Sequence, residues 1–187
     1  MALEAPEARR RRLLELVRSL AVARGEFRLA SGRASSFYLD ARKVTLHPEG
    51  AFLIARAILD IIAAEDLAAE AIGGLTLGAD PIAGAVAALS HQQGRPLRGF
   101  IVRKEAKAHG TQRRVEGDVR PGASVIVVDD VVTTAGSTLQ AIQAVEQMGC
   151  KVAAVVCVID REEGGREALG RYPFFPLFGA AEVLSSS

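Results

Sequence analysis

Residues 124–138 read SVIVVDDVVTTAGST, and this stretch decides the fold. Its first part, Ser124 to Val128, is a continuous apolar run rich in β-branched side chains, as in a strand that is covered on both faces of a parallel sheet. An apolar pattern with helical spacing begins near Leu139. A buried strand, a polar loop and a helix in this order predict one unit of an α/β fold, with this strand near the centre of the sheet.

The alternation of strand and helix extends to both sides of this unit. The predicted strands are short apolar runs and cover 69–73, 99–103, 124–128 and 152–159. The predicted helices share apolar positions at helical spacing and cover 7–23, 48–64, 81–92 and 137–148. Residues 27–30 and 37–40 flank a turn-forming segment as in a short hairpin, and Phe174, Phe175 and Phe178 indicate a late strand. The pattern predicts right-handed βαβ units around a central, mostly parallel sheet that helices flank.

Composition places the chain among ordinary globular proteins. Its 187 residues favour a single domain, and 49% hydrophobic with 24% charged residues excludes the disordered and disulfide-framework classes. The 23 basic and 22 acidic residues leave a net charge of +1, which argues against a nucleic-acid partner. Cys150 and Cys157 form neither a CxxC motif nor a metal-binding spacing. Since we find no signal-peptide pattern and no apolar run of membrane length, we expect a cytoplasmic protein without a membrane partner.

The polar loop after the central strand has the chemistry of a ribose phosphate site. At the start of a helix, unpaired backbone N–H groups and the helix dipole favour a phosphate. The hydroxyls that add further donors belong to Thr133, Thr134, Ser137 and Thr138. The adjacent carboxylates of Asp129 and Asp130 can accept hydrogen bonds from the two vicinal hydroxyls of a ribose. The alternative is an ordinary helix cap, in which these side chains only satisfy backbone donors.

A second polar segment, residues 100–117, reads FIVRKEAKAHGTQRRVEG. It begins as a strand and has neither a helical nor an alternating apolar pattern after Val102, which predicts a mobile loop. The cations of this loop are Arg103, Lys104, Lys107 and His109. Such a group suits a leaving pyrophosphate, whose negative charge grows as the bond breaks. The alternative is a solvated charge run on an ordinary loop.

Residues 125–138 resemble, without a gap, the signature of type I phosphoribosyltransferases, which bind 5-phosphoribosyl 1-pyrophosphate (PRPP). One departure is Ala135, where many relatives carry glycine and where a methyl group would crowd the phosphate. The resemblance implies a single domain over 1–187 with the type I phosphoribosyltransferase fold, in which about residues 1–45 form most of a small N-terminal hood. It implies that PRPP is bound by Thr76, Asp129, Asp130, Thr133, Thr134, Ala135, Gly136 and Ser137.

Four further stretches resemble the orotate phosphoribosyltransferases within that family. Residues 103–110, RKEAKAHG, resemble their catalytic loop, and residues 73–81, GGLTLGADP, resemble their pyrophosphate loop. Residues 27–38, FRLASGRASSFY, resemble their orotate-binding segment, with Ala30 where relatives often carry lysine, and residues 160–165, DREEGG, resemble the strand end whose arginine reaches the pyrimidine. The implied catalytic residues are Lys107, Arg103, Lys104, His109, Asp129 and Asp130. The implied orotate-binding residues are Phe37, Tyr38, Thr133 and Arg161.

The resemblance implies an enzyme that transfers the phosphoribosyl group of PRPP to orotate, giving orotidine 5′-monophosphate and pyrophosphate in pyrimidine biosynthesis. It implies Mg²⁺ as cofactor, with no metal ligand directly from the protein, and a homodimer in which residues 104–118 are shared between subunits. Two alternatives stay open at this point, namely transfer to another base and a PRPP-sensing regulator without catalysis. We interpret His47 and His91 as helix-end residues and the two cysteines as packing residues.

Overall fold

A computed structural model describes residues 5–28, 34–105 and 114–185. Its main sheet has six strands in the order β5-β4-β3-β6-β7-β8. The strands are β3 (Ala71–Leu75), β4 (Arg98–Val102), β5 (Val115–Glu116), β6 (Ser124–Val132), β7 (Lys151–Asp160) and β8 (Phe174–Gly179). All neighbouring strands are parallel except β5, which pairs antiparallel with β4. The predicted fold class, an α/β protein with a mostly parallel sheet and β6 near its centre, is confirmed.

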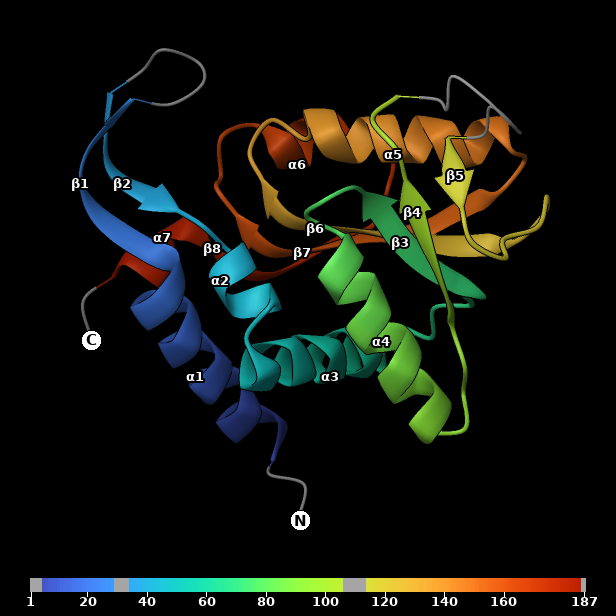
Figure 1. Ribbon diagram of the computed structural model, residues 1–187, viewed down its shortest axis with the longest axis horizontal. Helices are drawn as coiled ribbons and strands as arrows, with labels where there is room; N and C mark the ends of the chain where they lie inside the picture. Colours follow the sequence, from blue (N-terminus) through green and yellow to red (C-terminus); the bar gives the residue numbers. More distant parts are fainter. Residues whose placement is uncertain (1–4, 29–33, 106–113, 186–187) are drawn as a thin grey trace.

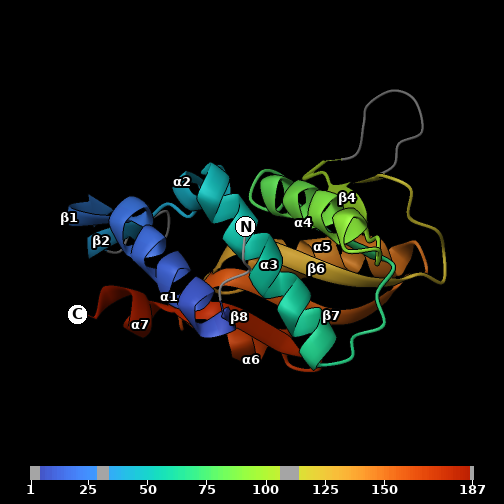
Figure 2. The same ribbon diagram turned by 90° about the horizontal axis from the view of Figure 1, so that it is seen from below.

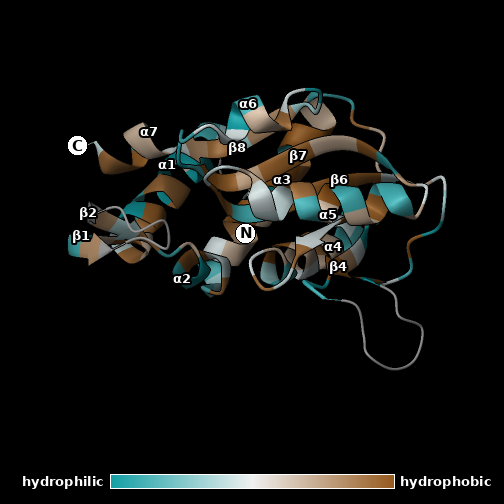
Figure 3. Ribbon diagram, turned by 90° about the horizontal axis from the view of Figure 1, so that it is seen from above, coloured by the Kyte–Doolittle hydropathy of each residue, from teal (hydrophilic) through white to brown (hydrophobic). Residues whose placement is uncertain are grey.

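Helices cover both faces of this sheet (Figures 1 and 2). One face carries α3 (Pro48–Ala64) and α4 (Asp80–Gln92), and the other carries α5 (Gly136–Gln147) and α6 (Gly165–Leu169). Along β6, Ile126 and Val128 join the apolar cluster beneath α3 and α4, whereas Val125 and Val127 join the cluster beneath α5. In Figure 3 the central strands are brown, whereas α5 alternates between brown and teal. Among the described residues, no helix has both the length and the apolar character needed to cross a membrane.

A smaller unit stands at one end of the sheet (Figures 1 and 2). It contains α1 (Pro6–Leu16), a π-helical turn (Val17–Ala21), β1 (Val22–Arg28) and β2 (Ala34–Leu39). The two strands pair antiparallel and form a separate two-stranded sheet, so the predicted hairpin is confirmed for the described strands. A short helix, α2 (Arg42–Thr45), leads from β2 to α3. We call this unit the hood; its limit at about residue 45 stays a prediction.

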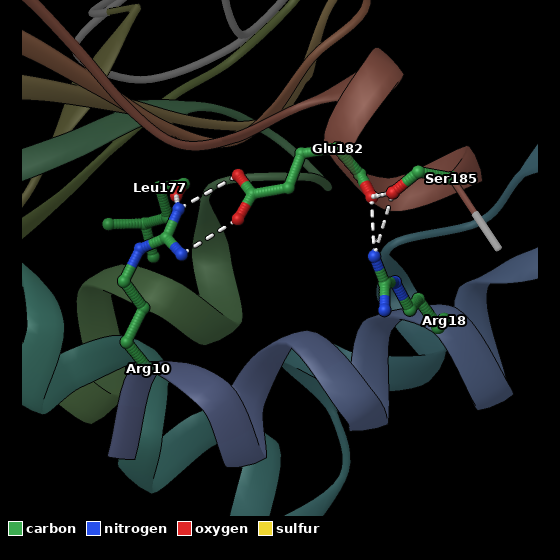
Figure 4. A network of polar contacts seen from close by, with 5 residues as sticks. All are labelled: Arg10, Arg18, Leu177, Glu182 and Ser185. Carbon is green, nitrogen blue, oxygen red and sulfur yellow. Dashed lines mark hydrogen bonds and ion pairs between the residues drawn. The ribbon is translucent and has the colours of Figure 1, made fainter. Parts of the chain in front are cut away.

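The two ends of the chain are tied together through α7 (Ala180–Leu184), as Figure 4 shows. Arg10 donates from Nη1 and Nη2 to the two carboxylate oxygens of Glu182, at 2.7 and 2.8 Å. The Arg10 guanidinium carbon also lies 4.9 Å from the ring centre of Phe178 in β8. Arg18 Nη2 donates to the backbone oxygen of Glu182 at 2.8 Å and to the Ser185 hydroxyl at 2.9 Å. Helix α7 therefore fastens the hood to the edge of the main sheet.

Several element limits differ from the sequence-based prediction. The helix predicted over 7–23 is α-helical to Leu16 and continues as the π-helical turn to Ala21, but β1 begins at Val22, where the sequence predicted helix. The reason is the pairing of Val22 with Leu39, which gives this segment a ladder partner in β2. The helix predicted over 48–64 is confirmed at both limits. His47 is the N-cap of this helix, because the His47 Nδ1 accepts a hydrogen bond from the Gly50 N–H.

Two differences concern the strands around the predicted chemistry. Strand β6 does not end at Val128 but continues to Val132, because the long strand β7 supplies partners up to Asp160. The adjacent acids therefore lie within the last part of the strand rather than after it. The segment predicted as a loop over 104–118 contains β5, in which Val115 is buried and pairs with Val102. Residues 106–113 of that segment lie outside the described residues.

Candidate active site

A cavity of about 420 Å³ opens at the carboxyl edge of the main sheet. Because β3, β4, β6 and β7 are parallel, their carboxyl ends meet there, which is where open parallel sheets bind ligands. The hood closes one side of the cavity with the end of β2 and the start of α2. The lining residues that the sequence had singled out are Tyr38, Thr76, Gly78, Lys104, Asp129, Asp130, Thr133, Ser137 and Arg161. The fold thus brings five separate stretches of sequence to one place.

The carboxylate of Asp129 is committed to holding the loop that follows it. Its Oδ2 accepts hydrogen bonds from the hydroxyls of Ser137 and Thr138, each at 2.8 Å, and its Oδ1 accepts from the Asp130 N–H at 3.0 Å. Burial, with only 5% of the residue exposed, raises the pKa of Asp129 to about 6, and the charge of Asp130 adds to the rise while the two hydroxyls oppose it. Asp129 therefore lines the cavity and also fastens the start of α5 to the end of β6.

Asp130 presents a more open carboxylate. Its Oδ1 accepts a hydrogen bond from the Val131 N–H at 2.9 Å, and its Oδ2 has no hydrogen-bond partner among the described residues. A Cβ placed on Gly78 would overlap this carboxylate, so the loop after β3 must carry glycine at that point to approach it. The side chain of Asp130 can therefore accept hydrogen bonds from a bound diol next to the Gly78 loop.

The loop from Thr133 to Ser137 forms the start of α5. Ala135 is the N-cap of α5 and has φ of 62° and ψ of 15°, the left-handed conformation that favours glycine. This backbone conformation is a second reason why many relatives carry glycine at this position, beside the expected crowding of a phosphate by the methyl group. Since the Ser137 and Thr138 hydroxyls donate to Asp129, the first N–H groups of α5 and the hydroxyls of Thr133 and Thr134 are the donors left for a phosphate.

The loop after β3 has a fixed threonine. The Thr76 hydroxyl donates a 2.6 Å hydrogen bond to Asp80 Oδ2 at the start of α4, and the Thr76–Leu77 peptide bond is cis. The proton of this hydroxyl is therefore committed to Asp80. In this conformation the Thr76 side chain can meet a ligand only as an acceptor, while the backbone N–H groups of the loop can still donate.

The base end of the cavity is built around Arg161, directly after β7. Its guanidinium carbon lies 5.4 Å from the ring centre of Phe37 in β2, and its Nη2 lies 2.8 Å from Glu163 Oε1. Phe37 does not line the cavity itself and meets the site through Arg161, whereas Tyr38 lines it. The Tyr38 ring in turn lies 5.8 Å from that of Phe27 across the hairpin. Arg161, Phe37 and Tyr38, predicted from separate segments, are thus brought together.

Of the four predicted cations of the loop, the structure describes two, and one of these two lines the cavity. Lys104 lines the cavity. Arg103 does not; its Nη1 lies 3.9 Å from Glu116 Oε1, and its backbone N–H donates to the Arg114 oxygen. Lys107 and His109 lie outside the described residues, as does Ala30. The described part of the loop therefore supplies one lysine to the site.

Sequence reasoning missed the segment that joins β2 to α2. Asp40 and Arg42 both line the cavity, and Arg42 Nε donates to Asp40 Oδ1 at 2.9 Å. This contact raises the pKa of Arg42 above its usual value. A signal was present, because an acid and an arginine two residues apart follow an aromatic strand.

The oxygen donors of the site fit Mg²⁺ in the form in which proteins often hold it. Among the residues that the structure describes, no group of three or more His, Cys, Asp or Glu side chains could hold a metal ion. Mg²⁺ commonly keeps several waters and is bound by one or two carboxylates together with substrate phosphates. The unpartnered Oδ2 of Asp130 suits such a hydrated ion.

A parallel sheet whose central strand carries paired acids near its end, followed by a hydroxyl-rich helix start and faced by a hood, defines a type I phosphoribosyltransferase. A model of the phosphoribosyl transferase domain matches residues 42–171. The orotate phosphoribosyltransferase of Rhodopirellula baltica is 46% identical over 163 residues, covering 85% of this chain and 84% of its own. That of Aquifex aeolicus is 44% identical over 180 residues, covering 94% and 97%. The chain belongs to the orotate phosphoribosyltransferase family, which confirms the resemblance.

Solved structures agree with this assignment. An orotate phosphoribosyltransferase of Mycobacterium tuberculosis superposes with a TM-score of 0.84 at 42% identity, covering 95% of this chain and 99% of its own. A second structure of the Mycobacterium enzyme, in complex with PRPP, has a TM-score of 0.79 at 38% identity and covers 94% and 98%. An adenine phosphoribosyltransferase of Leishmania donovani, at 17% identity and a TM-score of 0.65, shares the fold alone.

Proposed function

We propose that this chain transfers the 5-phosphoribosyl group of PRPP to orotate, with orotidine 5′-monophosphate and pyrophosphate as products. The observation that carries the proposal is Arg161, a cation only 10% exposed that lines the same cavity as the ribose-binding acids. An arginine suits the carboxylate that distinguishes orotate from uracil. Family membership supports the same reaction, because the relatives described above are orotate phosphoribosyltransferases.

The residues of the cavity divide the substrate between them. The start of α5 holds the 5-phosphate, Asp130 accepts hydrogen bonds from the ribose hydroxyls, and the backbone of the Thr76–Gly78 loop receives the pyrophosphate. The bond from the anomeric carbon to pyrophosphate breaks, and pyrophosphate leaves with the electron pair. The orotate ring nitrogen, which is acidic enough to react as an anion, gives up its proton to water and supplies the electron pair for the new bond to the anomeric carbon. Lys104 and the predicted Lys107, Arg103 and His109 stabilise the charge that grows on the leaving group.

Mg²⁺ is part of the proposal as the cofactor. When bound, it would neutralise charge on the pyrophosphate. Asp130 would hold the ion through water. The backbone N–H groups of the Thr76–Gly78 loop and the Thr76 side chain would face the same phosphates. We expect no direct ligand from the protein.

A homodimer completes the proposed site. Leu77 lines the cavity and is 71% exposed, and Leu46 after α2 and Phe52 in α3 are large apolar side chains that are also exposed. Apolar side chains of this kind mark a protein contact where they form one contiguous patch, and we propose that they do so here. A second copy of the chain placed here would bring its 104–118 segment to the neighbouring cavity.

The proposal includes the reducing, cytoplasmic location that the cysteine content indicates. Cys150 and Cys157 are free and buried. Burial raises the pKa of the Cys157 thiol well above its usual value, so that the thiolate needed for disulfide exchange is disfavoured. Both cysteines thus act as packing residues.

The reaction can be tested with the purified chain, PRPP and Mg²⁺. We expect loss of orotate with one pyrophosphate released for each orotidine 5′-monophosphate formed, much slower turnover of uracil and no turnover of adenine under the same conditions. Omission of Mg²⁺ should stop turnover. Turnover of adenine but not of orotate would move the chain to another base specificity, and PRPP binding without turnover of any base would make it a regulator.

A further inference from the structure

Glu163 lies beside the arginine at the base end of the cavity. Its Oε1 is 2.8 Å from Arg161 Nη2, and the two side chains are only 24% and 10% exposed. Glu163 does not itself line the cavity, whereas Arg161 does. The carboxylate therefore reaches the site through the guanidinium.

The Arg161 side chain is held from two different elements. Its backbone N–H donates to the Val132 oxygen at 2.8 Å, which fixes the start of the side chain against β6. Its guanidinium then lies between the Phe37 ring, which belongs to the hood, and Glu163, which belongs to the turn after β7. An arginine side chain carries about 2 kcal/mol of rotamer entropy. Holding it before the substrate arrives reduces the ordering cost of binding.

The contact with Glu163 leaves most of the guanidinium available. Nη2 makes the only hydrogen bond or ion pair of the Arg161 side chain among the described residues, and Nε is buried without a partner. A guanidinium has five N–H donors, so others remain for a carboxylate or carbonyl of the base. If Glu163 were a competitor for the substrate position, it would be expected to occupy the donors that the substrate needs. The geometry favours an orienting role instead.

We propose that Glu163 is a positioning residue, which acts on the base through Arg161 and touches no reacting atom. The inference rests on the proposed function, since it assumes that Arg161 contacts orotate. Loss of the Glu163 carboxylate should raise the KM for orotate about tenfold, which is the effect of weakening one charge-assisted contact. The value of kcat should stay within about twofold, because bond breaking at the sugar does not involve this side chain.

The test compares Glu163→Ala with a matched control. Glu167→Ala removes the same charge from an exposed position four residues further on, in α6, and should leave the KM for orotate unchanged. Glu163→Gln keeps an acceptor for Arg161 and should recover most of the lost affinity. The KM for PRPP should be the same in all three variants. Calorimetric binding of orotidine 5′-monophosphate should follow the same order as the KM for orotate without any turnover.

A double-mutant cycle decides whether Glu163 acts through Arg161. In an Arg161→Ala background, Glu163→Ala should add almost nothing to the KM for orotate, because the group that it positions is gone. The inference would be overturned if the two substitutions had additive effects on the KM for orotate. It would also be overturned if Glu163→Ala lowered that KM, or if Glu167→Ala raised it as much as Glu163→Ala does. A wild-type chain that turns over no orotate would instead overturn the proposed function, and this inference with it.

Discussion

The Ser137 hydroxyl donates a 2.8 Å hydrogen bond to Asp129 Oδ2, so the first turn of α5 is fastened to the end of β6. Thr138 donates to the same oxygen at the same distance. The paired acids of the family signature therefore have different surroundings. Asp129 holds the loop at the start of α5, and Asp130, whose Oδ2 has no hydrogen-bond partner among the described residues, is the acid that we propose for the ribose.

The different surroundings predict different effects of removing each charge. Asp130→Asn should weaken PRPP binding roughly 10- to 100-fold, because a charge-assisted hydrogen bond is worth roughly 1.5–3 kcal/mol. It should leave thermal stability nearly unchanged. Calorimetry with PRPP and Mg²⁺ gives the affinity, and unfolding monitored by circular dichroism gives the stability. An Asp130→Asn protein that binds PRPP like the parent would remove this residue from the ribose site.

Asp129 predicts a pH dependence of stability. Its pKa is raised to about 6 in the folded chain and is close to 3.8 when unfolded. Between these values the folded chain binds more protons, so the contribution of Asp129 to stability is fully present below about pH 4 and is lost as the pH rises through about 6. Two pKa units correspond to roughly 3 kcal/mol.

The measurement for this prediction is the difference in unfolding free energy between Asp129→Asn and wild type at several pH values. The difference should shift in favour of the variant as the pH rises from about 4 to 7, since asparagine has no charge to bury. A difference that is flat with pH would show that Asp129 does not titrate in this range.

Ala135 predicts a stabilising substitution. Its left-handed backbone disfavours any side chain, and glycine relieves this strain, which is of the order of 1 kcal/mol. Ala135→Gly should therefore raise the denaturation midpoint. Ala88→Gly, at an exposed position inside α4, is the matched control and should lower stability by about 1 kcal/mol. Equal losses in both proteins would mean that the backbone at residue 135 is not left-handed in solution.

The contact between Arg10 and Glu182 predicts which N-terminal arginine contributes more to stability. Arg10→Gln breaks a two-pronged contact and a stacking contact with Phe178, and should cost up to about 1 kcal/mol. Arg12→Gln also breaks a two-pronged contact, with Glu49 in α3, and a contact with Glu15, but it breaks no contact with an aromatic ring and should cost less than Arg10→Gln. Urea unfolding compares the two. A larger loss of unfolding free energy in Arg12→Gln than in Arg10→Gln would contradict the proposal that the Arg10–Glu182 contact holds the hood in place.

The parts of the structure that the sequence predicts are those with local causes. The unit from Ser124 to Met148 could be predicted because an apolar run, a hydroxyl-rich loop and helical spacing follow one another directly. Helix α3 was predicted at both limits because Pro48 suits the first helical position and the apolar spacing persists to Ala64. The residues that line the cavity after β3, β6 and β7 follow the rule for parallel sheets.

The parts that the sequence does not predict depend on distant partners. Arg10 and Glu182 are 172 residues apart, and no local pattern connects them. The change from helix to strand at Val22 depends on the pairing of Val22 with Leu39, which the local sequence around residue 22 does not reveal. In the same way, the commitment of the Ser137 hydroxyl to Asp129 depends on side-chain geometry, so the sequence could indicate the donors but not what they bind.

The central claim is that Arg161 makes this an enzyme for orotate. The most direct measurement is the ratio of kcat/KM for orotate to that for uracil in wild type and in Arg161→Ala. We expect a strong preference for orotate in wild type that falls by roughly 10- to 100-fold in the variant, because an arginine can pair with the orotate carboxylate and uracil has none. A variant that discriminates between the two bases as sharply as the parent would contradict it.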